Sequence, residues 1–262
     1  MIPQADIIAW RNVAPWLSDA QVEQDLIISR VLVELFNHPV LREQVAFRGG
    51  TALHKLYLKP AARYSEDIDL VQRAAGPFGE TMNIFRDILD GWLGEPHREQ
   101  GKDTVTLTYR TESEIPPVTP LRVKIEVNTR EHFTEFGFVE TPLSVRTRWF
   151  EGQSKVVTYT IEELLGTKLR ALYQRRKGRD LFDLWLGITA GNAAPDKIAR
   201  AFKRYLGAEG MSISQKQMAT NLELKMSHKA FQNDIIPLLR PDINYDPRAA
   251  YRTVKDLLLP LI

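Results

Sequence analysis

The hydrophobic pattern of this 262-residue sequence changes once, near residue 157. This change limits the fold classes that the chain can adopt. Before this point, segments that alternate polar and apolar residues, typical of β-strands, lie between segments with helical period. After it, every periodic segment is helical. The sequence therefore predicts an α+β domain with a mixed sheet over residues 1–157 and a helical domain over residues 158–262.

Capping residues, glycines and prolines place the expected elements along the chain. The expected strands cover residues 45–47, 65–71, 104–109 and 121–128. The expected helices cover about residues 18–38, 51–58, 80–93, 161–174 and 179–188, and three further helices follow, the last beginning at Asp246-Pro247. Thr160 and Glu163 have the spacing of a capping box at the start of the second domain.

Composition excludes several classes of protein. The chain has 35 basic and 33 acidic residues, so its net charge of +2 excludes binding driven by overall charge but leaves room for a local basic patch. The absence of cysteine excludes disulfides, thiolate zinc sites and cysteine nucleophiles. The sequence has no serine-hydrolase or Walker motif, and its histidines lack metal-ligand spacing. With no secretory signal and no apolar run of about 20 residues, we expect a cytoplasmic protein without membrane contact.

Asp67 and Asp69 are two residues apart on an expected strand, so both side chains leave the same face while Ile68 and Leu70 point into the core. Carboxylates about 7 Å apart repel each other unless a cation lies between them. A Mg²⁺ ion bound to nucleotide phosphates is one such cation. The alternative interpretation is a solvated acidic strand edge.

Gly49-Gly50-Thr51 lies between an expected strand and an expected helix. Backbone N–H groups at such a turn are free to bind an anion, and glycines allow a phosphate to approach the backbone closely. Thr51 could cap the helix or bind a phosphate oxygen. A tight turn alone also favours glycine, but the outward carboxylates of Asp67 and Asp69 soon after this turn favour a nucleotide site.

Glu126 is the candidate for a third carboxylate. It lies on the polar face of the strand over residues 121–128, whose other face is entirely apolar, and Lys124 and Asn128 flank it on the same face. Three carboxylates on neighbouring strands would suit a two-metal phosphoryl transfer. A surface strand of mixed charge is the alternative.

Lys168 falls within the apolar stripe of the helix over residues 161–174. Its ammonium either extends past the margin of the core or reaches an anion such as a triphosphate. A leucine at this position would complete the stripe, so we expect Lys168→Leu to lose activity but to be at least as stable as the wild type.

A basic turn, Arg175-Arg176-Lys177-Gly178-Arg179, leads into the next helix. It is either a solvated loop or a site that binds the phosphates of a nucleotide or nucleic acid. Residues 191–262 add eleven basic against seven acidic side chains.

Asp180 and Asp183 lie one turn apart on one face of the helix that follows the basic turn. Asp180 could be a helix-dipole partner and Asp183 could pair with Arg179. Alternatively, one of them orients Lys168 or Arg179, or contacts the nucleotide.

Four segments together resemble the signature of the AbiEii/AbiGii toxin family. They are residues 47–55 (FRGGTALHK), 63–70 (RYSEDIDL), 162–172 (EELLGTKLRAL) and 179–184 (RDLFDL), and they span about half of the chain. The members of this family are nucleotidyltransferase-like toxins of bacterial abortive-infection and toxin–antitoxin systems, and the mycobacterial MenT toxins are relatives.

The resemblance implies a DNA-polymerase-β-like nucleotidyltransferase fold, with a helical domain that completes the active-site cleft. It implies metal ligands at Asp67 and Asp69, an essential lysine at Lys168, and an essential aspartate at Asp180 or Asp183, which the motif does not separate. The residues expected to bind the nucleotide are Gly49, Gly50, Thr51, Lys55, Ser65 and Arg179. In some relatives the motif serine is also modified by the antitoxin.

The function expected from the sequence is a Mg²⁺- or Mn²⁺-dependent transfer of a nucleoside monophosphate from an NTP to an RNA. The leading acceptor is the 3′ end of a tRNA, bound by Arg175, Arg176 and Lys177. The protein would act as a toxin with a cognate antitoxin as partner. The alternatives are a nucleotidyltransferase that modifies a protein or a small molecule, and a catalytically silent nucleotide-binding module.

Overall fold

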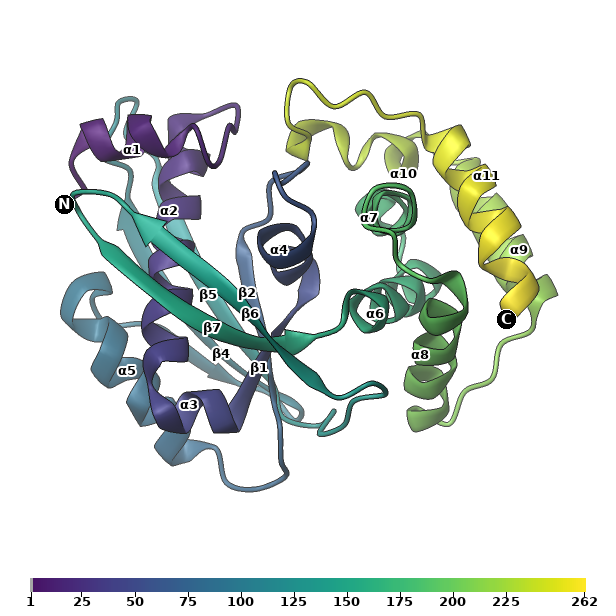
Figure 1. Ribbon diagram of the computed structural model, residues 1–262, viewed down its shortest axis with the longest axis horizontal. Coiled ribbons are helices and arrows are strands. Elements are labelled where there is room, and N and C mark those ends of the chain that lie inside the picture. The colour runs from purple at the N-terminus through teal and green to yellow at the C-terminus, as the bar shows by residue number, and fades with distance from the viewer. Residues whose placement is uncertain (1) are drawn as a thin grey trace. The chain divides into compact units, whose positions relative to one another are not determined.

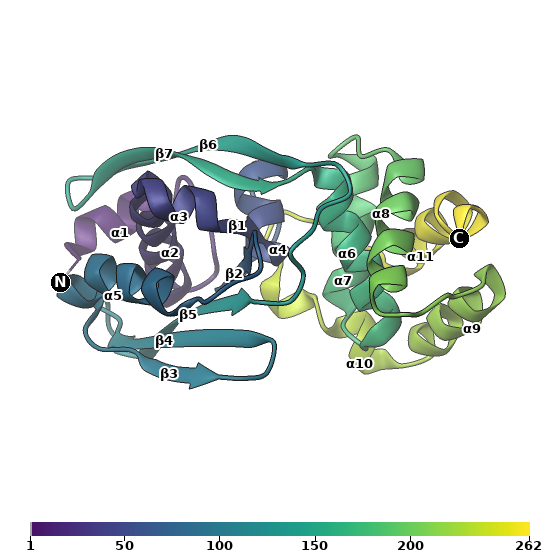
Figure 2. The same cartoon turned by 90° about the horizontal axis from the view of Figure 1, so that it is seen from below.

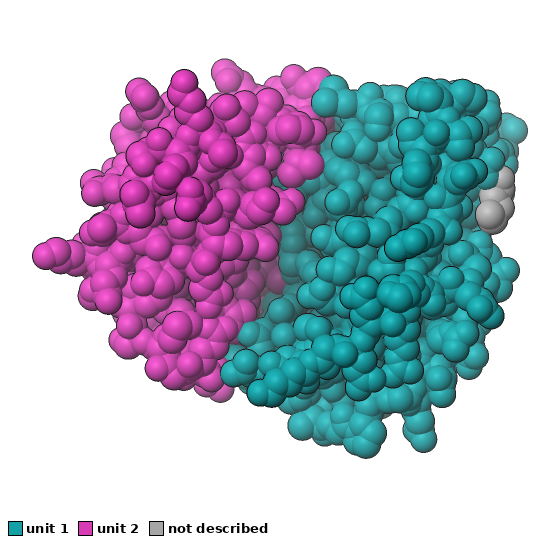
Figure 3. All heavy atoms as spheres, turned by 180° about the vertical axis from the view of Figure 1, so that it is seen from behind, with its two compact units in different colours: residues 1–133, 138–159 teal, residues 134–137, 160–262 magenta. Residues whose placement is uncertain are grey.

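The computed structural model describes residues 2–262 and divides the chain into two compact units (Figure 3). Unit 1 contains the chain up to Phe133 together with Phe138–Tyr159. Unit 2 contains Thr160–Ile262 and also the short segment Thr134–Gly137, which the linear division at 157/158 does not foresee. Among the residues described, no helix is long and apolar enough to cross a membrane.

A seven-stranded mixed sheet forms the framework of unit 1, which confirms the expected fold class. The strands are β1 (Val45–Arg48), β2 (Asp67–Gln72), β3 (His97–Gln100), β4 (Thr104–Glu112), β5 (Pro120–Asn128), β6 (Phe138–Arg146) and β7 (Glu151–Tyr159). Their order in the sheet is β3-β4-β5-β2-β1-β7-β6. The β2–β5 and β1–β7 pairs are parallel, and the other pairs are antiparallel. The sequence pattern did not predict β3, β6 or β7.

Helices pack inside the curve of this sheet. The helices of unit 1 are α1 (Gln4–Trp10), α2 (Asp19–Asn37), α3 (Pro39–Gln44), α4 (Gly49–Ala52), which continues as a π-helix (Leu53–Tyr57), and α5 (Gly79–Leu93). Helix α2 contacts β5, β6 and β7, strands from both halves of the sheet, so the sheet bends around it (Figure 2). Its buried residues include Leu26, Val33 and Phe36, which keep the helical period, and its N-terminus has the capping box of Ser18 and Gln21.

The helix after β1 begins earlier than the sequence suggests. It starts at Gly49, with Arg48 as its N-cap residue, instead of after the glycine pair. Thr51 therefore lies inside the helix and caps nothing. The cause is the backbone of Gly49, which turns the chain with φ of +81°, a conformation that strongly favours glycine.

Unit 2 is helical throughout its longer segment, as expected after residue 157 (Figure 1). Its helices are α6 (Ile161–Gln174), α7 (Gly178–Thr189), α8 (Pro195–Ala208), α9 (Gln215–Met226), α10 (Lys229–Asn233) and α11 (Pro247–Leu257), with short 3-10 turns at Ile236–Leu238 and Leu259–Leu261. Helix α6 packs against α7, α8 and α9 and is therefore the central helix of the unit.

Glu163 explains why residues 134–137 belong to unit 2. Only half of the expected capping box forms: the Thr160 hydroxyl accepts from the Glu163 N–H, but the Glu163 side chain turns inward and is fully buried. Its carboxylate accepts hydrogen bonds from the Thr134 hydroxyl at 2.7 Å, from two backbone N–H groups of the 134–137 segment, and from the Tyr205 hydroxyl at 2.9 Å. These bonds satisfy a charge that would be costly to bury alone.

Candidate active site

Strand β2 presents two carboxylates from one face. Asp67 and Asp69 are half-buried, whereas Ile68 and Leu70 between and after them are buried on the opposite face. This is the alternation expected from the sequence. Parallel pairing places Asp67 opposite Lys124 and Asp69 opposite Glu126 on β5.

The glycine pair lies directly against this strand. A Cβ atom on Gly49 would lie 2.0 Å from Asp69 Oδ2, and one on Gly50 would lie 2.4 Å from Arg63 Nη2 and 3.2 Å from Ser65 Oγ. Neither position has room for a side chain. The structure thus brings Gly49, Gly50, Ser65 and Asp69 together, as the resemblance implied.

The Thr51 hydroxyl makes contacts within unit 1 that the sequence analysis did not predict. Its hydroxyl donates to the Asp67 carbonyl at 2.6 Å and lies 2.9 Å from Ser65 Oγ, and the residue is only 1% exposed. In this structure the hydroxyl is bonded within the protein, and its expected contact with a phosphate stays a prediction. Thr51 ties α4 to the start of β2 and so positions the two aspartates.

Glu126 does not complete a three-carboxylate cluster. Its Oε2 accepts a hydrogen bond from Lys124 Nζ at 2.7 Å. Burial alone would lower the pKa of Lys124, but the charge of Glu126, followed by those of Asp67 and Asp69, raises it. Within residues 2–262, no group of three or more metal-binding side chains is placed to hold a metal ion. The metal role of Glu126 stays a prediction, and in this structure the lysine two residues earlier binds its carboxylate.

Two arginines near the glycine pair carry no assignment from the sequence analysis. Arg63 is 3% exposed beside Gly50, and Arg48 pairs in register with Asp69. Arg48 also forms an ion pair with Glu131, whose charge outweighs burial and raises the pKa of the guanidinium. Both arginines lie inside the motif segments, and that position was the only signal in the sequence.

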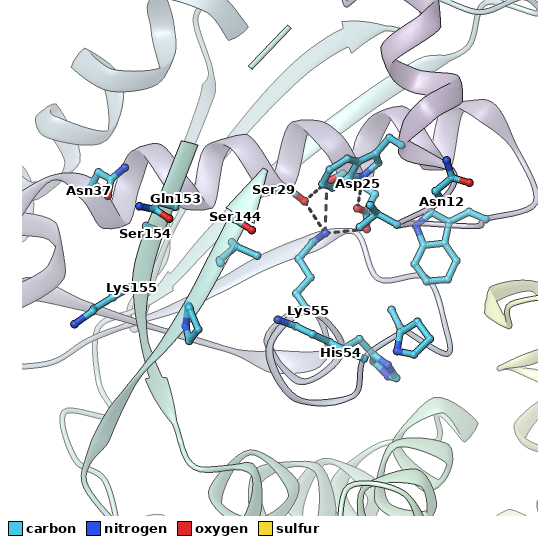
Figure 4. A pocket seen from close by; sticks show the side chains of 18 of the residues that line it. Asn12, Asp25, Ser29, Asn37, His54, Lys55, Ser144, Gln153, Ser154 and Lys155 are labelled. Atoms are coloured by element: carbon cyan, nitrogen blue, oxygen red, sulfur yellow. Dashed lines mark hydrogen bonds and ion pairs between the residues drawn. The ribbon is translucent and has the colours of Figure 1, made fainter. Parts of the chain in front are cut away.

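Lys55 points to α2 in this structure, and its role in binding the nucleotide stays a prediction. Its Nζ forms a 2.9 Å ion pair with Asp25 and donates to Ser29 Oγ, both on α2 (Figure 4). It lines a cavity of about 920 Å³ between α2, the π-helix and strands β6 and β7. Asp67 and Asp69 are not among the residues lining this cavity.

Lys168 is buried within unit 2 among carboxylates. Its Nζ lies 3.3 Å from Asp180 Oδ1 and 3.1 Å from Asp183 Oδ2, and both aspartates are fully buried. Arg175 adds two 2.8 Å hydrogen bonds to the carboxylate of Asp180. The lysine therefore neither extends into solvent nor carries an uncompensated charge. Its charged partners in this structure are the two aspartates, and the pairing of Asp183 with Arg179 is not seen.

The basic turn is also largely paired. Arg175 is itself exposed but binds the buried Asp180, while Lys177 Nζ lies 3.7 Å and Arg179 Nε 4.0 Å from the Asp234 carboxylate. Arg176 and Lys177 are exposed. Of the three residues predicted to bind RNA, Arg175 has a structural partner that its sequence spacing did not reveal.

Fold and comparison together define the class of protein: the chain is a nucleotidyltransferase. It belongs to the AbiEii family, because the family model described as nucleotidyl transferase AbiEii toxin, type IV toxin–antitoxin system, matches residues 30–255. A comparison with curated proteins gave no match. The family and the enzyme class expected from the motif segments are thus confirmed.

Solved structures agree with this fold. MenT4, a nucleotidyltransferase toxin from Mycobacterium tuberculosis, superposes with a TM-score of 0.65 at 16% identity, covering 100% of this chain and 99% of MenT4. A nucleotidyltransferase from Helicobacter pylori superposes with a TM-score of 0.54 at 16% identity, covering 92% and 94%. JHP933 from H. pylori gives 0.53 at 16% identity, covering 92% and 91%.

Proposed function

We propose that this chain is the toxin of a toxin–antitoxin pair and transfers a nucleoside monophosphate from an NTP to an RNA, using a divalent metal ion. The observation that carries the proposal is the contact of Asp69 with Gly49, beside Asp67 on the same strand face. Two carboxylates meet a backbone turn that has no room for side chains, and this combination suits a metal-bound polyphosphate.

The donor set fits Mg²⁺ or Mn²⁺. Asp67 and Asp69 offer carboxylate oxygens, the ligands that these hard cations favour, and one or two carboxylates with phosphate oxygens make a common Mg²⁺ site. A bound ion would act as a Lewis acid that neutralises charge on the phosphate oxygens. Asp67 and Asp69 are the residues that would hold it.

The remaining residues of this site would bind and orient the triphosphate. The backbone of Gly49 and Gly50 can approach phosphate oxygens closely, Ser65 offers a hydroxyl, and the Arg63 guanidinium beside Gly50 offers positive charge. An acceptor hydroxyl oxygen then bonds to the α-phosphorus, the bond from that phosphorus to the bridging oxygen breaks, and pyrophosphate leaves. The hydroxyl proton passes to solvent. Catalysis on this account is mainly positioning and electrostatics.

The acceptor we propose is RNA, with the 3′ end of a tRNA as the first candidate. Arg176 and Lys177 are exposed, and residues 191–262 carry an excess of basic side chains. Family membership supports an antitoxin partner, which we propose is encoded with this chain.

The test is transfer of label from each of the four α-labelled NTPs to total RNA, with Mg²⁺ or with EDTA. We expect Asp67→Ala and Asp69→Ala each to abolish labelling, because each removes a proposed metal ligand, while the melting temperature stays nearly unchanged at these half-buried positions. Asp87→Ala, at an exposed position of α5, is the matched control and should label RNA as the wild type does.

Other outcomes separate the alternatives. Label on a protein or a small molecule, with none on RNA, would contradict the proposed acceptor and leave the transfer reaction standing. Binding of NTP without transfer to any acceptor would identify a silent nucleotide-binding module. A large fall in melting temperature with activity retained would show that Asp67 and Asp69 are structural.

Lys168, Asp180 and Asp183 remain proposed site residues. The labelling assay of variants at these positions needs a control for stability. Removing Lys168 leaves two buried carboxylates with less compensation, so activity could be lost through unfolding of unit 2. Activity of these variants is therefore informative only at temperatures where circular dichroism shows that the variant is folded.

A further inference from the structure

Lys124 brings a positive charge into the group of carboxylates on β2 and β5. The register of the parallel pair sets Lys124 opposite Asp67 and Glu126 opposite Asp69, so one lysine lies among three carboxylates on two adjacent strands. Lys124 and Glu126 are two residues apart and leave the same face of β5, as Asp67 and Asp69 do on β2. The lysine ammonium lies 2.7 Å from Glu126 Oε2.

This pairing bears on how many metal ions the site can hold. In a two-ion site, a third carboxylate helps to hold the second ion, and the ions lie about 3.5–4 Å apart. Glu126 is the carboxylate in register for that task, but its Oε2 is bonded to an ammonium from its own strand. Among residues 2–262 no three-ligand cluster is formed. A second cation here would have to displace Lys124 or accept its repulsion.

We propose that Lys124 takes the place of a second metal ion, so that this nucleotidyltransferase holds one divalent ion, on Asp67 and Asp69, with the lysine ammonium neutralising Glu126 beside it. The inference rests on the proposed function, because it requires a metal-bound nucleotide. It makes Lys124 a positioning residue that sets the metal stoichiometry of the site.

The experiment measures Mn²⁺ bound to the full chain by electron paramagnetic resonance. The ligand is an NTP analogue with a methylene group between the α- and β-phosphates, used with each of the four bases, and the Mn²⁺ bound by the analogue alone is measured in parallel. We expect one Mn²⁺ per wild-type ternary complex. In Lys124→Met the count should rise to two, with the spin coupling of two Mn²⁺ ions about 3.5–4 Å apart.

Three further variants make the result specific. Lys124→Gln should also bind two ions and stands in for Lys124→Met if the latter does not fold. Lys102→Met, at an exposed position of unit 1, should keep one ion. Glu126→Gln should keep one ion at unchanged affinity, because Glu126 is no metal ligand when Lys124 is present, whereas Lys124→Met/Glu126→Gln should return the count from two to one.

The outcomes separate the inference from the function beneath it. Two ions in the wild type, or one ion in both folded Lys124 variants, would overturn the role of Lys124 and leave the metal-dependent reaction intact. If no protein-bound Mn²⁺ is detected with any of the four analogues, the metal-dependent function itself fails.

Discussion

At the scale of single residues, burial decides what the charged side chains of unit 2 can do. Lys168 enters the interior with a side chain that is 9% exposed, and Asp180 and Asp183 meet it there. Arg175, whose side chain is 49% exposed, adds a second positive charge beside the buried Asp180. Groups buried in this way depend on one another, because each is costly to bury without its partners.

Lys168→Leu should therefore be less stable than the wild type, contrary to the expectation from the apolar stripe. The leucine gains apolar burial, but the carboxylate of Asp183 loses its ion pair with Lys168, at a cost of about 3 kcal/mol in the free energy of unfolding. Urea unfolding checks this, with Lys203→Leu on the exposed face of α8 as the control. Stability equal to the wild type would show that the buried ion pairs contribute little.

Asp180 should make stability depend on acid pH. Burial alone would raise its pKa, but Lys168 and then Arg175 outweigh burial and hold the pKa below its ordinary value of 3.8. A carboxyl whose pKa is lowered by folding stabilises the protein above about pH 4 and loses this effect as the pH falls through the folded pKa. The stability difference between wild type and Asp180→Asn should thus be largest near neutral pH and shrink toward pH 3. Free energies of unfolding measured across this pH range test the prediction, with Asp196→Asn as the exposed control. A stability difference between wild type and Asp180→Asn that stays constant with pH would contradict it.

At the scale of elements, the turn from β1 into α4 joins the glycine motif to the strand of the aspartates. The turn needs a positive φ at Gly49, and the same residue must let Asp69 approach. These two demands are separable, because Gly94 has the same φ of +81° but nothing within 4 Å of its Cβ position.

Gly49→Ala should lose more affinity for Mn²⁺ than Gly94→Ala does. Both substitutions put a Cβ on a backbone with positive φ, and at Gly94, where ψ is −173°, this conformation is almost confined to glycine, so both should cost stability. Only Gly49→Ala also drives a methyl group into Asp69 Oδ2, so it alone should weaken Mn²⁺ binding, while Gly94→Ala leaves Mn²⁺ affinity unchanged. Chemical unfolding and Mn²⁺ titration measure the two effects. Equal losses of Mn²⁺ affinity in Gly49→Ala and Gly94→Ala would mean that the contact of Gly49 with Asp69 is unimportant.

At the scale of the whole molecule, positive charge is distributed unevenly along a chain whose net charge is only +2. Residues 1–190 carry 24 basic and 26 acidic side chains, whereas residues 191–262 carry 11 and 7. Arg176 and Lys177 lie just before the second segment and are exposed. Arg175 is not a suitable target for neutralisation, because its ion pair with Asp180 supports the interior.

Arg176→Gln/Lys177→Gln should weaken RNA binding and reduce its dependence on salt. Each lost phosphate contact removes roughly 0.7–0.9 from the slope of log K against log salt concentration. NTP affinity should stay nearly unchanged. RNA binding at several salt concentrations measures the slope, with Arg98→Gln/Lys102→Gln, at exposed positions of unit 1, as a control of equal charge. The basic turn is not part of the RNA contact if the test variant and the wild type have the same slope.

Local pattern was enough to predict the fold class and the principal motif contacts. Hydrophobic period depends on residues two to four positions apart, so the strand of Asp67 and Asp69 and the helical character of unit 2 could be inferred from the sequence. The motif segments likewise identified the family. The positive φ of Gly49 is a local requirement for glycine, whereas the close approach of Asp69 to this residue is a tertiary contact.

The pairing of charges was decided only by tertiary structure. Lys55 binds Asp25, 30 residues away in the sequence, and Thr134 joins unit 2 through Glu163, 29 residues away. Lys124 faces Asp67 only because β2 and β5 pair in parallel, in one register. A charged side chain pairs with whichever partner the fold brings within hydrogen-bonding distance. The hydrophobic period of the sequence does not encode that distance. The sequence by itself therefore determined the class of protein and the strand face of its carboxylates, while the fold decided which charges remain free to act.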